Sequence, residues 1–78
     1  MSKTAREFEI FRQALGRRIQ KIRKDKKHTQ ESLAESSGLD RVAVGYIEQG
    51  RRSPKLSTLY LLAKSLNVEV AAFFKRDR

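Results

Sequence analysis

The sequence has no cysteine, one histidine and one proline among its 78 residues. Without cysteine the chain can form neither a disulfide framework nor a zinc–thiolate site. No apolar run approaches the ~20 residues that a membrane-spanning helix needs. The first ten residues, MSKTAREFEI, lack the apolar segment of a signal peptide. These absences favour a cytoplasmic protein that does not enter a membrane.

Catalytic groups are equally scarce. His28 is the only histidine, and the sequence has no Gly-rich phosphate loop, no metal-ligand spacing and no acid pair placed for catalysis. We therefore expect a protein that is not an enzyme and that has no metal, no cofactor and no small-molecule ligand.

Acidic residues are half as frequent as basic ones, 9 against 18, and the formal net charge is +9. This balance predicts a polyanionic partner, nucleic acid first and an anionic membrane surface second. The charge is uneven: residues 1–30 carry 10 basic and 3 acidic side chains, residues 31–50 carry 1 and 4, and residues 51–78 carry 7 and 2. We interpret the flanking segments as the source of phosphate contacts, although part of their lysines would simply form a solvated face.

Apolar residues recur at steps of three and four, and no strand-like alternation occurs, so we expect one all-α domain over residues 1–78 with five short helices. The helices are expected at about 5–26, 30–36, 41–49, between Ser57 and Asn67, and at about 69–74. Their expected N-terminal caps are Thr4, Thr29, Asp40 and Ser57. The expected core positions are Phe8, Phe11, Leu15, Ile19 and Ile22 in the first helix, with Leu59, Leu62, Ala63, Leu66 and Phe73 near the C-terminus. Gly16, in mid-helix, would be explained by a close helix crossing.

The segment Thr29–Gly50, TQESLAESSGLDRVAVGYIEQG, has the pattern of a helix, a tight turn and a second helix. Leu33 and Ala34 would face inward, Gly38 would form the turn, and Val44 and Ile47 would anchor the second helix. Arg41, Val42, Ala43 and Tyr46 are then left facing outward. The sequence therefore predicts a helix-turn-helix at about residues 29–49 that binds double-stranded DNA.

The outward residues suit the major groove, which admits one α-helix. Arg41 can reach guanine O6 and N7 with its guanidinium, or alternatively touch only phosphate. Val42 and Ala43 can contact thymine methyl groups, or simply allow a close approach. The Tyr46 hydroxyl can reach a base or a phosphate, or the ring can pack over its own helix.

The chain resembles the lambda-repressor-like DNA-binding domains, which include phage repressors, Cro-type proteins and Xre-type regulators. The resemblance covers residues 14–74 and is strongest at Gln30, Ala34, Gly38, Val44 and Ile47, and in the segment GRRSPKLSTLYLLAKSLNV. Leu39-Asp40-Arg41 and the paired phenylalanines near the C-terminus resemble restriction–modification controller proteins. The resemblance implies a compact five-helix domain that regulates transcription as a homodimer on a palindromic operator.

The resemblance also implies roles for individual residues. Phosphate contacts are expected from residues around the helix-turn-helix, each of which is otherwise a solvated surface residue: Gln30, Gln49, Arg51, Arg52, Lys55 and Ser57. Arg23 and Glu48 align with a partly buried ion pair between the first and third helices. Lys27 replaces a common glycine and His28 an aliphatic residue, which predicts a more polar or strained corner.

Surplus apolar residues at 58–74 predict a dimer interface formed by Tyr60, Leu61, Val70, Ala71 and Phe74, unless several of them pack under the first helix. A competing function for the same fold is an antitoxin, an autorepressor that also binds a protein toxin. A membrane-surface protein is disfavoured, because the core needs the apolar stripe of the first helix.

Overall fold

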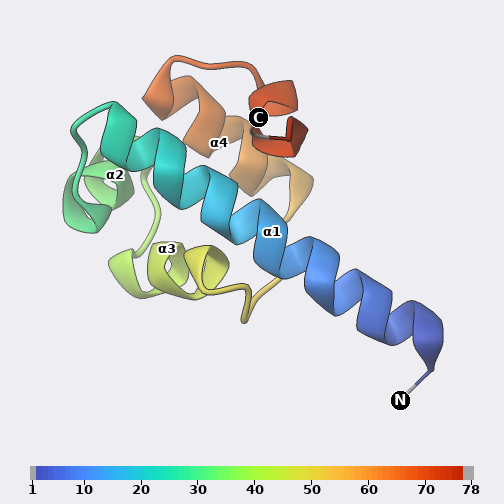
Figure 1. The fold of residues 1–78 in the computed structure, drawn as a ribbon. Coiled ribbons are helices and arrows are strands. Elements are labelled where there is room, and N and C mark those ends of the chain that lie inside the picture. Colours follow the sequence, from blue (N-terminus) through green and yellow to red (C-terminus); the bar gives the residue numbers. More distant parts are fainter. Residues whose placement is uncertain (1, 77–78) are drawn as a thin grey trace.

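The computed structural model describes residues 2–76, and its regular structure is entirely helical (Figure 1). In chain order the elements are α1 (Lys3–Asp25), α2 (Gln30–Ser37), α3 (Arg41–Glu48), α4 (Leu56–Leu66) and the short 3₁₀-helix η1 (Val70–Phe74). No strand occurs in this part of the chain, so the predicted all-α fold is confirmed. The expected fifth helix is a 3₁₀-helix, the form that short helical segments commonly take.

The first helix begins earlier than the sequence predicted. Ser2 is its N-cap, and the Ser2 Oγ accepts a hydrogen bond from the backbone N–H of Ala5 at 3.1 Å. The expected cap at Thr4 is therefore wrong, because Thr4 lies inside the helix. Ser2 can cap because its hydroxyl lies three residues before the unpaired N–H of Ala5. The helix therefore starts about half a turn before the start that the sequence predicted.

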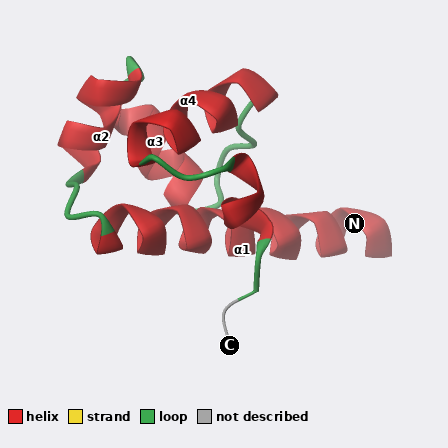
Figure 2. Cartoon of the chain, turned by 90° about the horizontal axis from the view of Figure 1, so that it is seen from above, coloured by secondary structure: helices red, strands yellow, loops and turns green. Residues whose placement is uncertain are grey.

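The apolar stripe of α1 is buried only in its C-terminal part. Leu15 and Ile19 are buried and Ile22 packs against the core, whereas Phe8 and Phe11 are 48% and 50% exposed. Figures 1 and 2 show the reason: the N-terminal turns of α1 extend beyond the body formed by the other helices. The expectation that the whole stripe belongs to the core is therefore wrong for Phe8 and Phe11.

The remaining core follows the predicted positions. The buried side chains come from all five elements and form one cluster: Leu15, Ile19, Leu33, Ala34, Val44, Ile47, Leu59, Leu62, Ala63, Leu66 and Phe73. Each of the helices α1 to α4 contributes one face, and the buried residues on that face have the three- and four-residue spacing of an amphipathic helix. This cluster holds α2 and α3 against α1 and α4.

Gly16 marks the crossing of α1 over α3. A Cβ atom at this position would lie 2.6 Å from the carbonyl oxygen of Glu48 and still closer to that of Ile47. Real Cβ atoms do not approach backbone oxygens so closely, so only glycine fits there. A close crossing, which would explain a glycine in mid-helix, is present, and it brings the end of α3 directly against α1.

The fourth helix starts before its expected cap. Lys55 occupies the N-cap position without a side-chain hydrogen bond, and Ser57 lies in the first turn. The predicted capping role of Ser57 is therefore wrong. Asn67 closes α4 as expected, in the left-handed conformation with φ +57°.

The corner between α1 and α2 is strained at Lys27, which has a left-handed φ of +66°. Lysine occupies the position after the helix end that glycine usually takes, while the backbone N–H of His28 reaches back to the carbonyl of Arg23 at 3.0 Å. The strained corner that the sequence predicted is present.

We expect Lys27→Gly to raise the free energy of unfolding by about 0.5–1 kcal/mol, because relief of the left-handed strain outweighs the extra chain entropy of glycine. Urea denaturation would measure the change. Lys26→Gly is the matched control, since Lys26 has φ −86° and gains nothing from glycine. If Lys27→Gly lost as much stability as Lys26→Gly, the backbone at Lys27 would not be strained.

Candidate nucleic-acid interface

The segment α2–turn–α3 forms the predicted helix-turn-helix. Gly38 ends α2 with φ +76°, a left-handed conformation that favours glycine. The backbone N–H of Leu39 then bonds the carbonyl of Ala34 at 3.0 Å, which turns the chain into α3. Val44 and Ile47 are buried, so the opposite side of α3 must face outward.

The outward side of α3 carries the residues expected to face DNA. Arg41 is the first residue of the helix and is exposed, and Val42 is 48% exposed. Ala43 is half-buried, while Tyr46, one turn after Val42, is 37% exposed. Asp40 occupies the predicted N-cap position, but its side chain forms no capping hydrogen bond. The N-terminal end of α3 therefore presents a cationic tip followed by small and apolar side chains.

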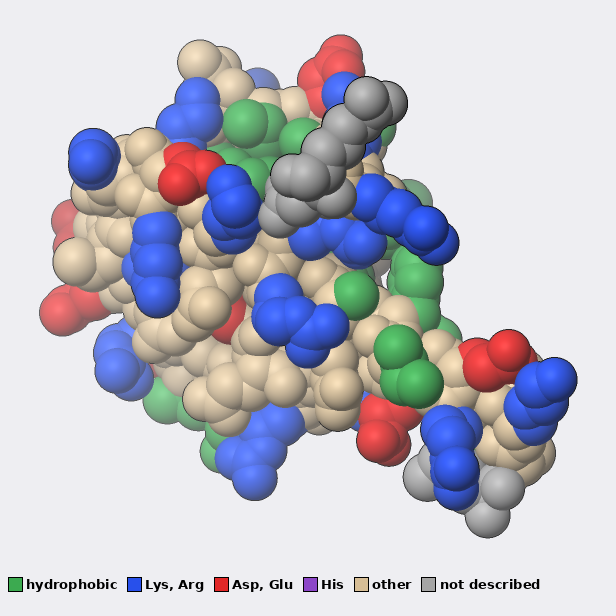
Figure 3. Space-filling view, in the orientation of Figure 1, with side chains coloured by type: hydrophobic (Ala, Val, Ile, Leu, Met, Phe, Trp, Pro, Cys, Tyr) green, Lys and Arg blue, Asp and Glu red, His purple; other side chains and the backbone are tan. Residues whose placement is uncertain are grey.

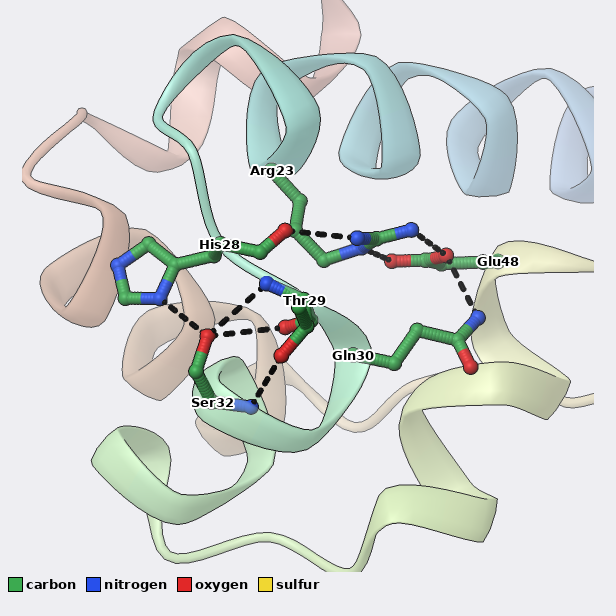
Figure 4. Close-up of polar contacts among 6 residues, drawn as sticks. All are labelled: Arg23, His28, Thr29, Gln30, Ser32 and Glu48. Carbon is green, nitrogen blue, oxygen red and sulfur yellow. Dashed lines mark hydrogen bonds and ion pairs between the residues drawn. The ribbon is translucent and has the colours of Figure 1, made fainter.

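Behind α3, Arg23 and Glu48 form the ion pair that the resemblance implied (Figure 4). The Arg23 Nε donates to Glu48 Oε2 at 2.6 Å and its Nη2 donates to Oε1 at 3.1 Å. The Arg23 Nη1 donates to the backbone carbonyl of His28 at 2.8 Å. The two side chains are 8% and 1% exposed, so this charged pair lies inside the protein. It connects α1, the corner at His28 and the end of α3.

Gln30 belongs to the same network. Its Nε2 donates to Glu48 Oε1 at 3.0 Å, and the side chain is half-buried (Figure 4). Gln30 was expected to be a surface residue that contacts phosphate, but its side chain points inward, because the Glu48 carboxylate offers a buried acceptor. The amide also lies beside Gly45, at the contact between α2 and α3.

The corner at His28 is polar, as the sequence predicted, but its contact with Ser32 was not foreseen. Thr29 caps α2 as predicted, with its Oγ1 accepting from the Ser32 backbone N–H at 2.9 Å. The Ser32 Oγ accepts from the Thr29 backbone N–H at 3.0 Å and lies 2.9 Å from His28 Nδ1. The sequence does contain a pattern that could have predicted the role of Ser32. Thr29 and Ser32 have the spacing of a capping box, with serine in place of the usual Glu or Gln.

Apart from Gln30 at the start of α2, the expected phosphate-contacting residues lie around the end of α3 and the start of α4. All except Gln30 are exposed: Gln49, Arg51, Arg52, Lys55 and Ser57. A further contact holds this loop to α1, because Arg12 Nε donates to the carbonyl of Gly50 at 2.6 Å. This contact was not foreseen, because a basic residue on an exposed helix face has no distinctive local pattern.

Arg51 and Arg52 do not extend freely into solvent. Their guanidinium carbons lie 5.9 and 5.1 Å from the centroid of the Tyr46 ring. Such cation–π contacts are worth about 0.5–1 kcal/mol each at exposed sites. The two arginines therefore share one aromatic surface on the outward side of α3.

Basic side chains also occur far from the helix-turn-helix. Figure 3 shows Lys and Arg distributed over the whole face in view, including the protruding end of α1. A shallow hollow along α1 is lined by Ala14, Arg17, Arg18, Gln20, Lys21 and Arg76. The net positive charge therefore extends beyond the outward residues of α3.

The predicted dimer residues form part of an exposed apolar surface. Tyr60, Leu61 and Phe74 are 57%, 39% and 41% exposed, and Ala71 is exposed. Val70 instead packs against the core. The Phe74 ring stacks on Phe11 with a centroid separation of 6.0 Å, and Phe11 on Phe8 at 6.4 Å, which lengthens the apolar surface along α1.

None of the helices described above is both long and apolar enough to cross a lipid bilayer.

Comparison with known proteins identifies relatives along most of the chain. The family model described as helix-turn-helix matches residues 19–73. The chain is 38% identical over 70 residues to control protein C.SmaI of Serratia marcescens, covering 90% of this chain and 83% of that protein. It is 45% identical over 58 residues to the immunity repressor protein of Bacillus phage phi105, covering 74% of this chain but only 40% of the repressor.

Comparison with solved structures also finds a similar controller protein. The restriction-modification controller protein C.AhdI from Aeromonas hydrophila is similar with a TM-score of 0.78 at 39% identity, covering 80% of this chain and 94% of that one. The matched regions include the whole helix-turn-helix and the helix that follows it.

Proposed function

Because this chain belongs to the helix-turn-helix family and is a DNA-binding transcriptional regulator, we propose that it acts as a homodimer on a palindromic operator. The observation that carries the proposal is the outward side of α3, where Arg41 and Val42 are exposed at the end of a firmly packed helix. One such helix contacts few base pairs, so a C₂ dimer would place two of them at half-sites one helical turn apart.

Arg41, Val42 and Ala43 are the proposed base-reading residues, and phosphate contacts come from the surrounding exposed side chains. The backbone at the start of α2 supplies a further anion-binding position, because its first N–H groups lack helical partners. The net charge of +9 adds a salt-dependent attraction that does not depend on sequence.

Selection of bound oligonucleotides from a random pool tests the proposal as a whole. We expect a palindrome with half-site centres ~10 bp apart. Recovery of sequences without a shared motif would show binding through charge alone and would overturn it.

We expect Arg41→Ala to lower discrimination between the selected operator and a random duplex by about 1–3 kcal/mol, through loss of a bidentate contact to guanine. Fluorescence anisotropy with both duplexes measures the difference. Arg17→Ala is the charge-matched control, because Arg17 is exposed on α1 and lines the hollow described above. Equal loss of affinity for both duplexes would mean that Arg41 contacts only phosphate.

The dimer interface is proposed at the C-terminal apolar surface, formed by Tyr60, Leu61, Val70, Ala71 and Phe74. Exposed rings beside a small core support this proposal, because a second copy would cover them. We expect Phe74→Ser to raise the dimer dissociation constant at least tenfold, as loss of a central aromatic contact does. Sedimentation equilibrium measures it, with Val42→Ser as a control that removes a similarly exposed apolar side chain from α3. A wild-type monomer at high micromolar concentration would rule out the interface.

The biological role that we propose is control of a restriction–modification system. Two of the similar proteins, C.SmaI and C.AhdI, are controllers by name, and the similarity to the first spans 90% of the chain. A neighbouring endonuclease and methyltransferase gene pair, with the operator in their promoter region, is the expected result. A neighbouring toxin gene would instead support the antitoxin function.

A further inference from the structure

Tyr46 has an unusual environment for a base-reading residue. Its ring lies beneath two guanidinium groups, those of Arg51 and Arg52, at 5.9 and 5.1 Å. The three side chains together line one shallow hollow on the outward side of α3. The ring of this tyrosine therefore contacts two cations, a role that a residue reading bases through its hydroxyl does not need.

The backbone explains why both arginines reach this ring. Gly50 has φ +73° and reverses the chain immediately after α3, so that the backbone N–H of Arg51 bonds the carbonyl of Tyr46 at 2.9 Å. The reversal is anchored to α1, because a Cβ at position 50 would lie 2.7 Å from the Cα of Gln13. The hydrogen bond from Arg12 to the Gly50 carbonyl holds the same point. Arg51 and Arg52 therefore leave the backbone from a fixed position beside the last turn of α3.

The charges of the pair have no compensating carboxylate in the part of the chain that the structure describes. Neither Arg51 nor Arg52 forms an ion pair with a carboxylate of residues 2–76. Like charges repel, and attraction to the same electron-rich ring is the feature that keeps both guanidinium groups beside Tyr46. Two cations beside one ring, without an ion-pair partner among the described residues, suit an anionic ligand, and phosphate oxygens match the guanidinium geometry.

The place of Tyr46 along α3 supports the same interpretation. Recognition helices contact base edges with their N-terminal residues, and Arg41 and Val42 occupy that end here. Tyr46 lies in the last turn, next to the loop whose side chains are candidates for the DNA backbone.

We propose that Tyr46 is a positioning residue, whose ring holds Arg51 and Arg52 together as one phosphate-binding pair, and that its hydroxyl reads no base. The inference rests on the proposed DNA-binding function and assigns sequence discrimination to Arg41, Val42 and Ala43 alone. Because the pair would contact phosphate, Tyr46 contributes equally to binding of any duplex.

Tyr46→Phe and Tyr46→Leu separate the ring from the hydroxyl. We expect Tyr46→Phe to bind the operator and a random duplex as the wild type does. We expect Tyr46→Leu to lose about tenfold in affinity for both duplexes, because the two arginines are then no longer held beside each other and one of their phosphate contacts is lost. The slope of log K against log salt should also become shallower by about one, the value for one lost phosphate contact.

A double-mutant cycle shows whether Tyr46 acts through the arginines. In an Arg51→Gln/Arg52→Gln background, Tyr46→Leu should have no further effect on affinity or on the salt slope. An equal effect in both backgrounds would overturn the proposal, as would a loss of operator discrimination in Tyr46→Phe. Thermal melting checks that each variant is folded, and Tyr46→Met replaces the leucine variant if that one melts below the assay temperature.

The outcomes also separate this inference from the proposed function. If Arg41→Ala leaves discrimination unchanged while the Tyr46 cycle behaves as expected, the base-reading assignment fails and the phosphate pair stands. If Arg41→Ala behaves as expected but Tyr46→Leu binds like wild type, only the positioning role is rejected.

Discussion

Replacing Glu48 by alanine is expected to lower the free energy of unfolding by about 3–5 kcal/mol, the loss seen when one partner of a buried ion pair is removed. The carboxylate accepts hydrogen bonds from two nitrogens of Arg23 and from the amide of Gln30. Without it, the Arg23 guanidinium stays buried, and the carbonyl of His28 is its one remaining hydrogen-bond partner among the described residues. Urea denaturation followed by circular dichroism measures the loss.

Glu35→Ala is the matched control, because Glu35 is exposed on α2 and its side chain has no ion pair or hydrogen bond with any of residues 2–76. We expect its stability to change by no more than about 0.5 kcal/mol. Equal unfolding midpoints for the two variants would show that Glu48 is not structural. Replacing the pair together, as Arg23→Met with Glu48→Leu, should recover much of the loss, because no uncompensated charge remains.

Replacing Gly16 by alanine is the second change with a large expected effect, a loss of about 3 kcal/mol or more from overpacking against an inflexible backbone. The new methyl group would overlap the carbonyl oxygens of Ile47 and Glu48, neither of which can rotate away. In a helix without a close neighbour, the same substitution would raise the free energy of unfolding by about 1 kcal/mol. A loss of stability therefore indicates that α1 and α3 cross closely at Gly16. Thermal or urea unfolding gives the sign of the change directly.

Gly45→Ala supplies the contrast within the same protein. Its added Cβ would lie 3.7 Å from the Gln30 Oε1, which is ordinary van der Waals contact. We expect this variant to gain up to about 1 kcal/mol from helix propensity. A gain in both glycine variants would contradict the close approach of α1 and α3.

Local sequence patterns determined the helices and most of the core. The three- and four-residue spacing of apolar positions places Leu33, Val44, Ile47 and Leu62 inside, because the same periodicity governs every α-helix wherever it packs. The glycine at position 38 marked the turn for a similarly local reason, since the left-handed backbone there favours a residue without Cβ. The resemblance added the pairing of Arg23 with Glu48, which no local pattern contains.

Helix caps could be predicted only in part. Thr29 caps α2 as expected, whereas Thr4 and Ser57 lie within helices whose first residues are Lys3 and Leu56. Several hydroxyl residues near a helix start satisfy the same capping pattern, and the packing of the helix selects among them. The sequence alone therefore locates a helix better than its first residue.

What the sequence by itself determined is the helical class, the helix-turn-helix and the outward side of α3, because each depends on periodicity within one short segment. Only the tertiary structure decided which partners meet across segments. It exposed Phe8 and Phe11, because α1 is longer than the body it packs on. It turned Gln30 inward to Glu48 and folded Arg51 and Arg52 over Tyr46. These contacts depend on distances between elements, which a one-dimensional pattern does not contain.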